Sequence, residues 1–210
     1  ILLNAGSGPG ELSRSLADRL EAQVVSLDRE RILLKACQLP ICADLHRLPF
    51  ASESFDGVFS RLFAIAYALG SQWNENRADW EALARGFGSV LKKGGRAVLE
   101  VPLAHDPESL QGINENAKLN NGILYHFQYL ESLRKTPFGC ILDSLIQVSK
   151  GGDRYVIGAP VHVFHPVGGA DWFRSAGMDL EGFCASYDSE TFTMDPPPDC
   201  LRGVMIGRKT

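Results

Sequence analysis

Apolar positions along the first hundred residues follow two alternating patterns. Short, mostly apolar runs at residues 1–5 and 24–28 end at a glycine cluster and at an aspartate, which is typical of buried parallel strands followed by turns. Between them, apolar residues recur at helical spacing and predict a helix over residues 10–21. Further strands are predicted near Ile41, at 56–60 and at 97–101, and further helices at 29–37 and from Trp80 to the Gly94-Gly95 pair. Strands that alternate with helices favour a parallel sheet covered on both faces.

After Pro102 the pattern becomes antiparallel. Two runs rich in β-branched and aromatic residues, 141–148 and 155–164, flank the sequence Lys150-Gly151-Gly152-Asp153, which predicts a hairpin. The stretch before this hairpin is predicted to be a linking segment. A helix over residues 170–175 and two last strands at 180–187 and 201–206 follow. The whole pattern predicts an α/β fold with a small antiparallel β insert.

Composition and charge narrow the class of protein. The chain has 210 residues, of which 45% are hydrophobic and 22% charged, and it contains no apolar run long enough to span a membrane. Lys and Arg number 21 against 25 Asp and Glu, with no basic run, and this balance argues against binding to a nucleic-acid backbone. We therefore expect a small-molecule substrate, with no nucleic-acid or membrane partner.

The cysteines and histidines point to neither a disulfide framework nor a metal site. Five scattered cysteines, none in a CxxC spacing, indicate reduced thiols and a cytoplasmic location. His162 and His165 are expected on opposite faces at the end of a strand, so we expect no shared metal. No signal peptide is visible, and because Ile1 lies inside a predicted strand, we expect further residues upstream that could close an active site.

The strongest chemical signal is a glycine loop between the first predicted strand and helix. Its sequence, Asn4-Ala5-Gly6-Ser7-Gly8-Pro9-Gly10, would let a ligand lie directly on the backbone, beside the amides that begin the helix. Asp28, at the end of the next strand, could accept two hydrogen bonds from a ribose diol. The spacing is GxGxG, whereas the dinucleotide fingerprint is GxGxxG. A simple tight turn is the alternative interpretation of such a loop.

Four segments in order resemble the class I S-adenosylmethionine-dependent methyltransferases. They are LLNAGSGPG at 2–10, VVSLD at 24–28, ADLHRLPFASESFDGVFS at 43–60 and LKKGGRAVLEVP at 91–102. The third is the most specific, because nicotinamide enzymes lack an acidic residue followed by LPF and a strand that opens at an aspartate. The resemblance implies a Rossmann-like, doubly wound sheet of order 3-2-1-4-5-7-6 with strand 7 antiparallel. It also implies one methyltransferase domain over 1–210, with a cofactor-binding core at 1–102, a linker and insert at 103–165, and the last helix and strands at 166–210.

The resemblance assigns residues to the adenosine part of S-adenosylmethionine. Asp28 would accept the ribose diol, and Arg29 would lie beside the adenine. Asp44 would accept a hydrogen bond from the adenine amino group, and the amide of Leu45 would bond a ring nitrogen. The product of the reaction, S-adenosylhomocysteine, would bind in the same place.

The methionine part of the cofactor is assigned to the ends of two strands. Gly6 and Gly8 would form its backbone cradle, and Ser60 and Arg61 would line the methionine end. The family usually carries an acidic residue at the position of Asn4. Asparagine keeps a hydrogen-bond acceptor but loses the charge, so it is either a tolerated substitution or the mark of a weakened cofactor site.

Methyl transfer from a sulfonium needs alignment and exclusion of water but no covalent intermediate. A general base helps when the acceptor is a hydroxyl or a protonated amine. His105 is the candidate base, and Tyr67 is a candidate pocket hydroxyl. Phe63 is expected to form an apolar wall, and Tyr125 and His126 to face the substrate. A solvated loop histidine and simple helix packing are the alternative interpretations of the first two.

Three parts of the second half carry a looser resemblance: the antiparallel layer at 141–164, FHPVGGADWFRSAGM at 164–178 and SYDSETFTMDPPPDCLRGVMIGRK at 186–209. They resemble a branch of the family, glycine- and amino-sugar-type N-methyltransferases, in which such a layer often roofs the substrate pocket or helps to form a dimer. We therefore expect an enzyme that methylates N or O of a small molecule, with a homodimer possible. One alternative is a non-catalytic homologue with a weakened cofactor site. The other is a nicotinamide-dependent oxidoreductase, which the GxGxG spacing disfavours.

Overall fold

The computed structural model describes residues 1–61, 77–111, 114–118, 124–150, 153–184, 193–195 and 200–210. Its first half is a parallel sheet, as the alternating pattern predicts. The strands of this half are β1 (Leu2–Ala5), β2 (Val24–Asp28), β3 (Leu39–Cys42), β4 (Phe55–Ser60) and β5 (Leu91–Leu103). They lie in the order β3-β2-β1-β4-β5, and each neighbouring pair is parallel.

Two antiparallel strands complete this sheet beyond β5. The last strand, β11 (Cys200–Lys209), pairs antiparallel with β5, and β10 (Met178–Cys184) pairs antiparallel with β11. The resulting order, β3-β2-β1-β4-β5-β11-β10, is the predicted order 3-2-1-4-5-7-6 with strand 7 antiparallel. The fold prediction is therefore confirmed. The antiparallel β11 also differs from the dinucleotide-binding order 3-2-1-4-5-6, so the structure disfavours the nicotinamide alternative.

The helices lie where the sequence predicts them, but they begin and end at other residues than predicted. They are α1 (Glu11–Leu20), α3 (Arg77–Val90) and α4 (Pro166–Ser175), with 3-10 turns η1 (Leu33–Ala36) and η2 (Pro107–Leu110). Only a 3-10 turn forms where a helix over 29–37 was expected. α3 ends at Val90 rather than at Gly94-Gly95, because Leu91 already pairs with β4. α4 begins at Pro166, before the predicted start, because His165 caps it and proline suits the first helical position.

The main core lies between the sheet and the pair α3 and α4. One face of α3 is fully buried against β1, β4 and β5, through Trp80, Leu83, Ala84, Phe87 and Val90. Burying each large apolar side chain contributes about 1.5–3 kcal/mol, so this helix face fixes α3 on the sheet. The two helices lie in close contact, since a Cβ on Gly88 would overlap the backbone of Ala176 just after α4.

The insert is larger than the sequence pattern indicated. Its strands β6 (Asn114–Lys118), β7 (Leu124–Thr136), β8 (Gly139–Lys150) and β9 (Asp153–Phe164) pair antiparallel in succession. β9 returns to β5, where Phe164 pairs with Leu103. The predicted hairpin is present as β8 and β9, but the stretch expected to link it to β5 forms β6 and β7 instead.

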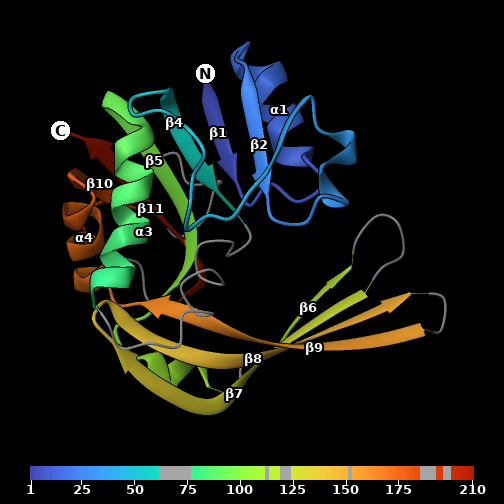
Figure 1. The fold of residues 1–210 in the computed structure, drawn as a ribbon. Helices are drawn as coiled ribbons and strands as arrows, with labels where there is room; N and C mark the ends of the chain where they lie inside the picture. The colour runs from blue at the N-terminus through green and yellow to red at the C-terminus, as the bar shows by residue number, and fades with distance from the viewer. Residues whose placement is uncertain (62–76, 112–113, 119–123, 151–152, 185–192, 196–199) are drawn as a thin grey trace.

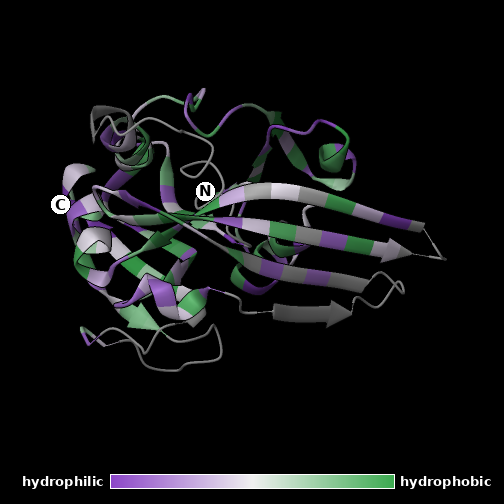
Figure 2. Ribbon diagram, turned by 90° about the horizontal axis from the view of Figure 1, so that it is seen from below, coloured by the Kyte–Doolittle hydropathy of each residue, from purple (hydrophilic) through white to green (hydrophobic). Residues whose placement is uncertain are grey.

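The insert lies across from the carboxyl ends of the parallel strands. Figure 1 shows β1 and β4 pointing toward the layer formed by β6 to β9. Hydrophilic and hydrophobic residues are interspersed along its strands (Figure 2), as expected for a layer that is partly exposed. Its base is buried through Leu142, Val161 and Val163, whereas Tyr155 and Val156 near the far end are exposed.

Candidate functional site

The glycine loop follows β1 and is fastened to the end of β2. Gly6, Gly8 and Gly10 have φ angles of 73°, 54° and 78°, in the left-handed region that favours glycine. The Gly6 N–H donates to the Leu27 carbonyl at 2.8 Å. A Cβ on Gly8 would meet nothing within 4 Å among the described residues, whereas one on Gly10 would lie 2.5 Å from Cys37 Sγ. Gly10 is therefore needed for packing, and the backbone at Gly8 is open to a ligand.

Asp28 joins the glycine loop to the end of β2. Its Oδ2 accepts a hydrogen bond from the Gly8 N–H, and its Oδ1 accepts one from the Glu30 N–H, both at 2.9 Å. A carboxylate has about four acceptor positions, so two remain for a ligand hydroxyl pair. Arg29 lies beside it on the surface, with Nε 3.5 Å from the Glu30 carboxylate. The structure thus brings together the glycine loop and the acid predicted to bind a ribose.

The segment after β3 places two more predicted residues next to this acid. The Ala43 N–H donates to the Asp28 carbonyl at 3.1 Å, so the chain leaves β3 beside the end of β2. Asp44 follows and is exposed, with Oδ1 accepting from the His46 N–H at 2.9 Å. Leu45 is half-buried and packs against the main core. The ends of β1, β2 and β3 therefore gather the residues predicted for the adenosine.

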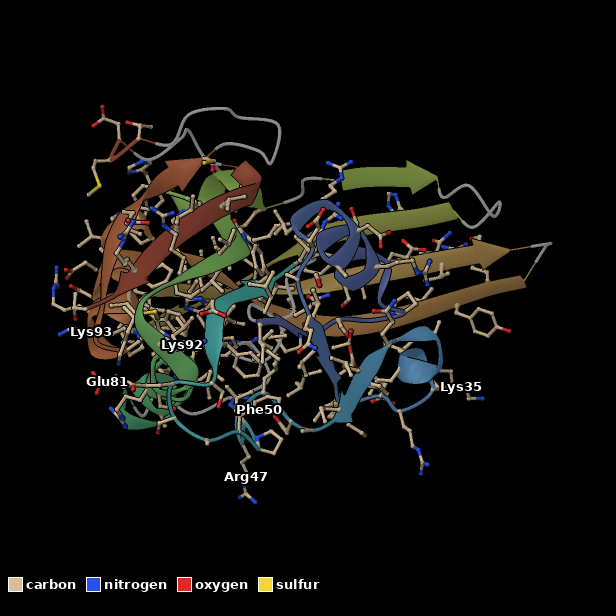
Figure 3. All side chains as sticks on the ribbon, turned by 90° about the horizontal axis from the view of Figure 1, so that it is seen from above. Lys35, Arg47, Phe50, Glu81, Lys92 and Lys93 are labelled. Atoms are coloured by element: carbon tan, nitrogen blue, oxygen red, sulfur yellow. The ribbon has the colours of Figure 1, made fainter. Side chains whose placement is uncertain are left out.

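The LPF sequence anchors that segment. Leu48 and Phe50 pack against the core, and the Phe50 ring meets Phe55 of β4 edge-on at 4.8 Å between centroids. Arg47, which directly precedes Leu48, points away from the molecule (Figure 3). Packing of Leu48 and Phe50 against the core thus holds the loop in place and gives the motif a structural cause.

Asn4 belongs to a buried polar network below the glycine loop. Its side chain is 1% exposed, and Nδ2 donates to Ser13 Oγ of α1 at 2.9 Å. The Ser26 hydroxyl of β2 donates to the same Ser13 oxygen at 2.6 Å. Asn4 Oδ1 has no hydrogen-bond partner in the described part of the chain. The Asn4 amide therefore links β1 to α1 and, through Ser13, to β2, and both interpretations of the substitution stay predictions.

At the end of β4 lie Ser60, Arg61 and a residue that the sequence analysis missed, Glu100. Ser60 is fully buried, and Arg61 is half-exposed. Arg61 Nε lies 3.6 Å from Oε2 of Glu100, a β5 residue whose side chain is 2% exposed. No described residue bonds to Glu100 Oε1. The signal that could have found it is a charged residue inside the apolar run AVLEVPL.

The predicted substrate residues are less well defined. Phe63 and Tyr67 fall within 62–76, outside the described residues. Tyr125 and His126 belong to β7, paired with Val148 and Gln147 of β8, and not to a linking segment. His126 is half-buried in this layer. Their proposed contacts with substrate stay predictions.

His105 lies apart from the residues predicted for the cofactor. β5 continues four residues beyond Leu99, which is level with Ser60, and this adds roughly 13 Å before the strand ends. The His105 ring is exposed and meets the His165 ring at 5.8 Å between centroids. A cavity of about 520 Å³ lies there, lined by η2, the β7–β8 turn and the start of α4. None of the predicted cofactor residues lines this cavity.

Two buried groups near the base of the insert have strongly shifted pKa values. His162 is fully buried between Trp80 and Phe164, with Nε2 2.8 Å from Thr136 Oγ1, and burial lowers its pKa to about 3. Burial raises the pKa of the Cys140 thiol to about 12. Both groups are therefore neutral at physiological pH and serve packing rather than proton transfer.

The described part of the chain offers few other sites. Three of its cysteines, Cys37, Cys42 and Cys140, are free thiols. No group of three or more His, Cys, Asp or Glu side chains in the described ranges could hold a metal ion. None of the described helices has the length and apolar character needed to cross a membrane.

Comparison with known sequences finds methyltransferases. A family model described as a methyltransferase domain matches residues 3–99. A malonyl-[acyl-carrier protein] O-methyltransferase of Gallionella capsiferriformans is 33% identical over 140 residues, which are 57% of this chain. The match covers 44% of that relative, so it spans less than half of the relative's length.

Comparison with solved structures gives the same fold over the whole chain. The CcbJ methyltransferase of Streptomyces caelestis matches with a TM-score of 0.73 and 16% identity, covering 100% of this chain and 83% of that one. CalS10 of Micromonospora echinaspora, an amino pentose methyltransferase with S-adenosylmethionine bound, matches with a TM-score of 0.68, 16% identity and the same coverage. The methyltransferase domain matched over residues 3–99, the strand order and the solved structures together give this chain the fold of the S-adenosylmethionine-dependent methyltransferases.

Proposed function

We propose that this chain transfers a methyl group from S-adenosylmethionine to a nitrogen or oxygen atom of a small molecule. The observation that carries the proposal is the Asp28 carboxylate, held by the Gly8 N–H at the point where the glycine loop meets the end of β2. This arrangement places an acceptor for a diol beside open backbone, as a nucleoside cofactor requires.

The described residues fit this cofactor. Asp28 keeps acceptor positions for a ribose diol, and the backbone at Gly8 leaves room for the methionine part. Asp44 and the Leu45 amide would meet the adenine, with Arg29 beside it. When bound, S-adenosylmethionine supplies a methyl group carried by a sulfonium. Once the methyl group is transferred, the rest of the cofactor leaves as a neutral thioether.

Gly6, Ser60 and Arg61 would complete the methionine end of the site. Gly6 directly follows β1, and Ser60 is the last residue of β4. Because β1 and β4 are parallel neighbours, both residues belong to the carboxyl edge of the sheet. Asn4 would contribute its unpartnered Oδ1 from below the loop. These groups would bind and orient the cofactor, because methyl transfer depends on alignment and exclusion of water.

The substrate would lie between this edge and the insert. The relative that matches in sequence is named as an O-methyltransferase, and CalS10 as an amino pentose methyltransferase, so both acceptor types occur among similar proteins. Tyr67 and Phe63 stay candidates for the pocket. The distance of His105 from the cofactor residues weakens its case as the base. A cytoplasmic location and a homodimer also stay predictions.

The test is methyl transfer itself. The protein is incubated with methyl-labelled S-adenosylmethionine and a panel of small amines, alcohols and carboxylic acids, and S-adenosylhomocysteine formation is measured. We expect formation with at least one acceptor, its loss in Asp28→Ala, and its retention in Asp18→Ala, which removes an exposed acid of α1. Binding of the cofactor without turnover on any acceptor would favour the non-catalytic alternative.

A further inference from the structure

Among the described residues, Glu100 is a buried acid whose single partner is a distant one. Its side chain is 2% exposed, and no described residue bonds to Oε1. Its ion pair with Arg61 is long, at 3.6 Å, beyond the usual range of a hydrogen bond. Glu181 on β10 shows the contrast, because it accepts from Arg96 at 2.7 Å and from Arg208 at 2.6 Å.

The strand register places Glu100 at the cofactor edge. Asn4 of β1 pairs with Phe59 of β4, and Phe59 pairs with Val98 of β5. Partnered residues share a face of the sheet, and residues two apart on one strand share it as well. Glu100 therefore lies on the same face as Asn4, one residue beyond the Leu99 that pairs with Ser60 at the end of β4. Both Asn4 Oδ1 and Glu100 Oε1 are buried acceptors without donors in the described residues.

The charges at this point favour a cation. Arg61 is 46% exposed, so solvent screens much of its positive charge, whereas the Glu100 carboxylate is shielded from solvent. A buried carboxylate with spare acceptor positions is costly unless a donor meets it. An ammonium group supplies both the charge and the N–H donors. An anionic acceptor would instead meet the buried negative charge of Glu100.

We propose that Glu100 recognises the substrate and that the substrate is an amine, which makes this chain an N-methyltransferase. This inference rests on the proposed function and names its acceptor. The bound ammonium gives one proton to the Glu100 carboxylate, which becomes a neutral carboxyl. The freed nitrogen lone pair forms the new C–N bond as the bond between methyl carbon and sulfur breaks, with its electron pair moving to sulfur. The positive charge of the sulfonium ends on the methylated nitrogen.

Three variants test the role of Glu100. Glu100→Gln removes the charge and keeps the shape, and Glu100→Asp keeps the charge on a shorter side chain. Glu181→Gln is the matched control, since it removes a paired acid from a neighbouring part of the same sheet. S-adenosylhomocysteine binding is measured first by calorimetry. We expect equal affinity in wild type, Glu100→Gln and Glu181→Gln.

The substrate side is then probed with S-adenosylhomocysteine at saturation. The probes are isopropylammonium chloride, 2-propanol and sodium acetate, which present a cation, a neutral hydroxyl and an anion on a similar frame. We expect wild type and Glu181→Gln to bind the ammonium in preference to the other two. Glu100→Gln should bind it about tenfold more weakly or worse, the worth of one charge-assisted hydrogen bond. Glu100→Asp should keep part of the preference.

Each contrary result has a separate meaning. If wild type does not bind S-adenosylhomocysteine, the proposed cofactor site fails. If it binds but Glu100→Gln weakens that affinity, the cation that Glu100 meets belongs to the cofactor, and the amine proposal is overturned. The amine proposal is also overturned if wild type does not bind the ammonium saturably, or if it prefers acetate or 2-propanol. It fails as well if Glu100→Gln, which lacks the charge, binds the ammonium as tightly as wild type does. Unfolding in urea completes the test. A structural role for Glu100 would make Glu100→Gln less stable than wild type. We expect a loss of stability only for Glu181→Gln.

Discussion

The burial of His162 makes the stability of the fold depend on pH. Burial lowers its pKa from 6.5 to about 3, and the side chains around it, Trp80, Phe164 and Thr136, carry no charge. Between these two values the unfolded chain takes up a proton that the folded chain does not. The free energy of unfolding therefore falls by about 1.4 kcal/mol for each pH unit below the unfolded pKa. At pH 5, His162 alone should remove roughly 2 kcal/mol relative to pH 7.

Urea unfolding of wild type and His162→Gln at pH 7 and pH 5 measures this quantity. Glutamine does not titrate, and its amide can still bond to Thr136. Carboxylates contribute equally in both proteins, so the difference between their pH dependences isolates the histidine. We expect wild type to lose roughly 2 kcal/mol more than the variant on acidification. Parallel losses would refute the reasoning, because His162 would then be protonated in the folded chain or exposed to solvent.

Other substitutions test the packing and the polar network. Gly88→Ala should lower the free energy of unfolding by roughly 1–3 kcal/mol, because its Cβ would overlap the neighbouring backbone. The Cβ of Gly86→Ala would meet nothing within 4 Å among the described residues, so helix propensity should raise the free energy of unfolding by about 1 kcal/mol. Urea midpoints for both should fall on opposite sides of the wild type. Asn4→Asp should cost roughly 1–3 kcal/mol because the carboxylate cannot donate into its network, and an unchanged urea midpoint would contradict this. The buried Cys140, with a pKa of about 12, should resist a thiol reagent until the chain unfolds, while exposed Cys42 reacts at once; mass mapping of labelled peptides checks the order.

Local sequence signals predict the first half of the fold well. The glycine loop, Asp28 and the LPF segment each fix a turn or a strand end within a few residues, so their placement follows from nearby sequence. The boundary between α3 and β5 does not follow from nearby sequence, because neither Val90 nor Leu91 is a helix-breaking residue. The strand begins there because Leu91 pairs with Phe55, a contact distant in sequence.

The insert and the buried polar groups depend on distant contacts. β7 carries Gln, Glu, Ser, Arg and Lys among its apolar residues and becomes a strand because β6 and β8 pair with it. Nothing local shows that the Asn4 amide would bond to Ser13, since the two belong to different elements. The burial of Glu100 is likewise unexpected, because charged residues are rarely fully buried.

The most direct test of the cofactor site is calorimetric titration of the protein with S-adenosylhomocysteine, beside Asp28→Ala and the control Asp18→Ala. Asp28 is the acid that links the glycine loop to the end of β2, whereas Asp18 is an exposed acid of α1. We predict saturable binding by wild type and Asp18→Ala and its loss in Asp28→Ala. Equal binding by all three, or binding by none, would contradict the assignment of this edge of the sheet to the cofactor.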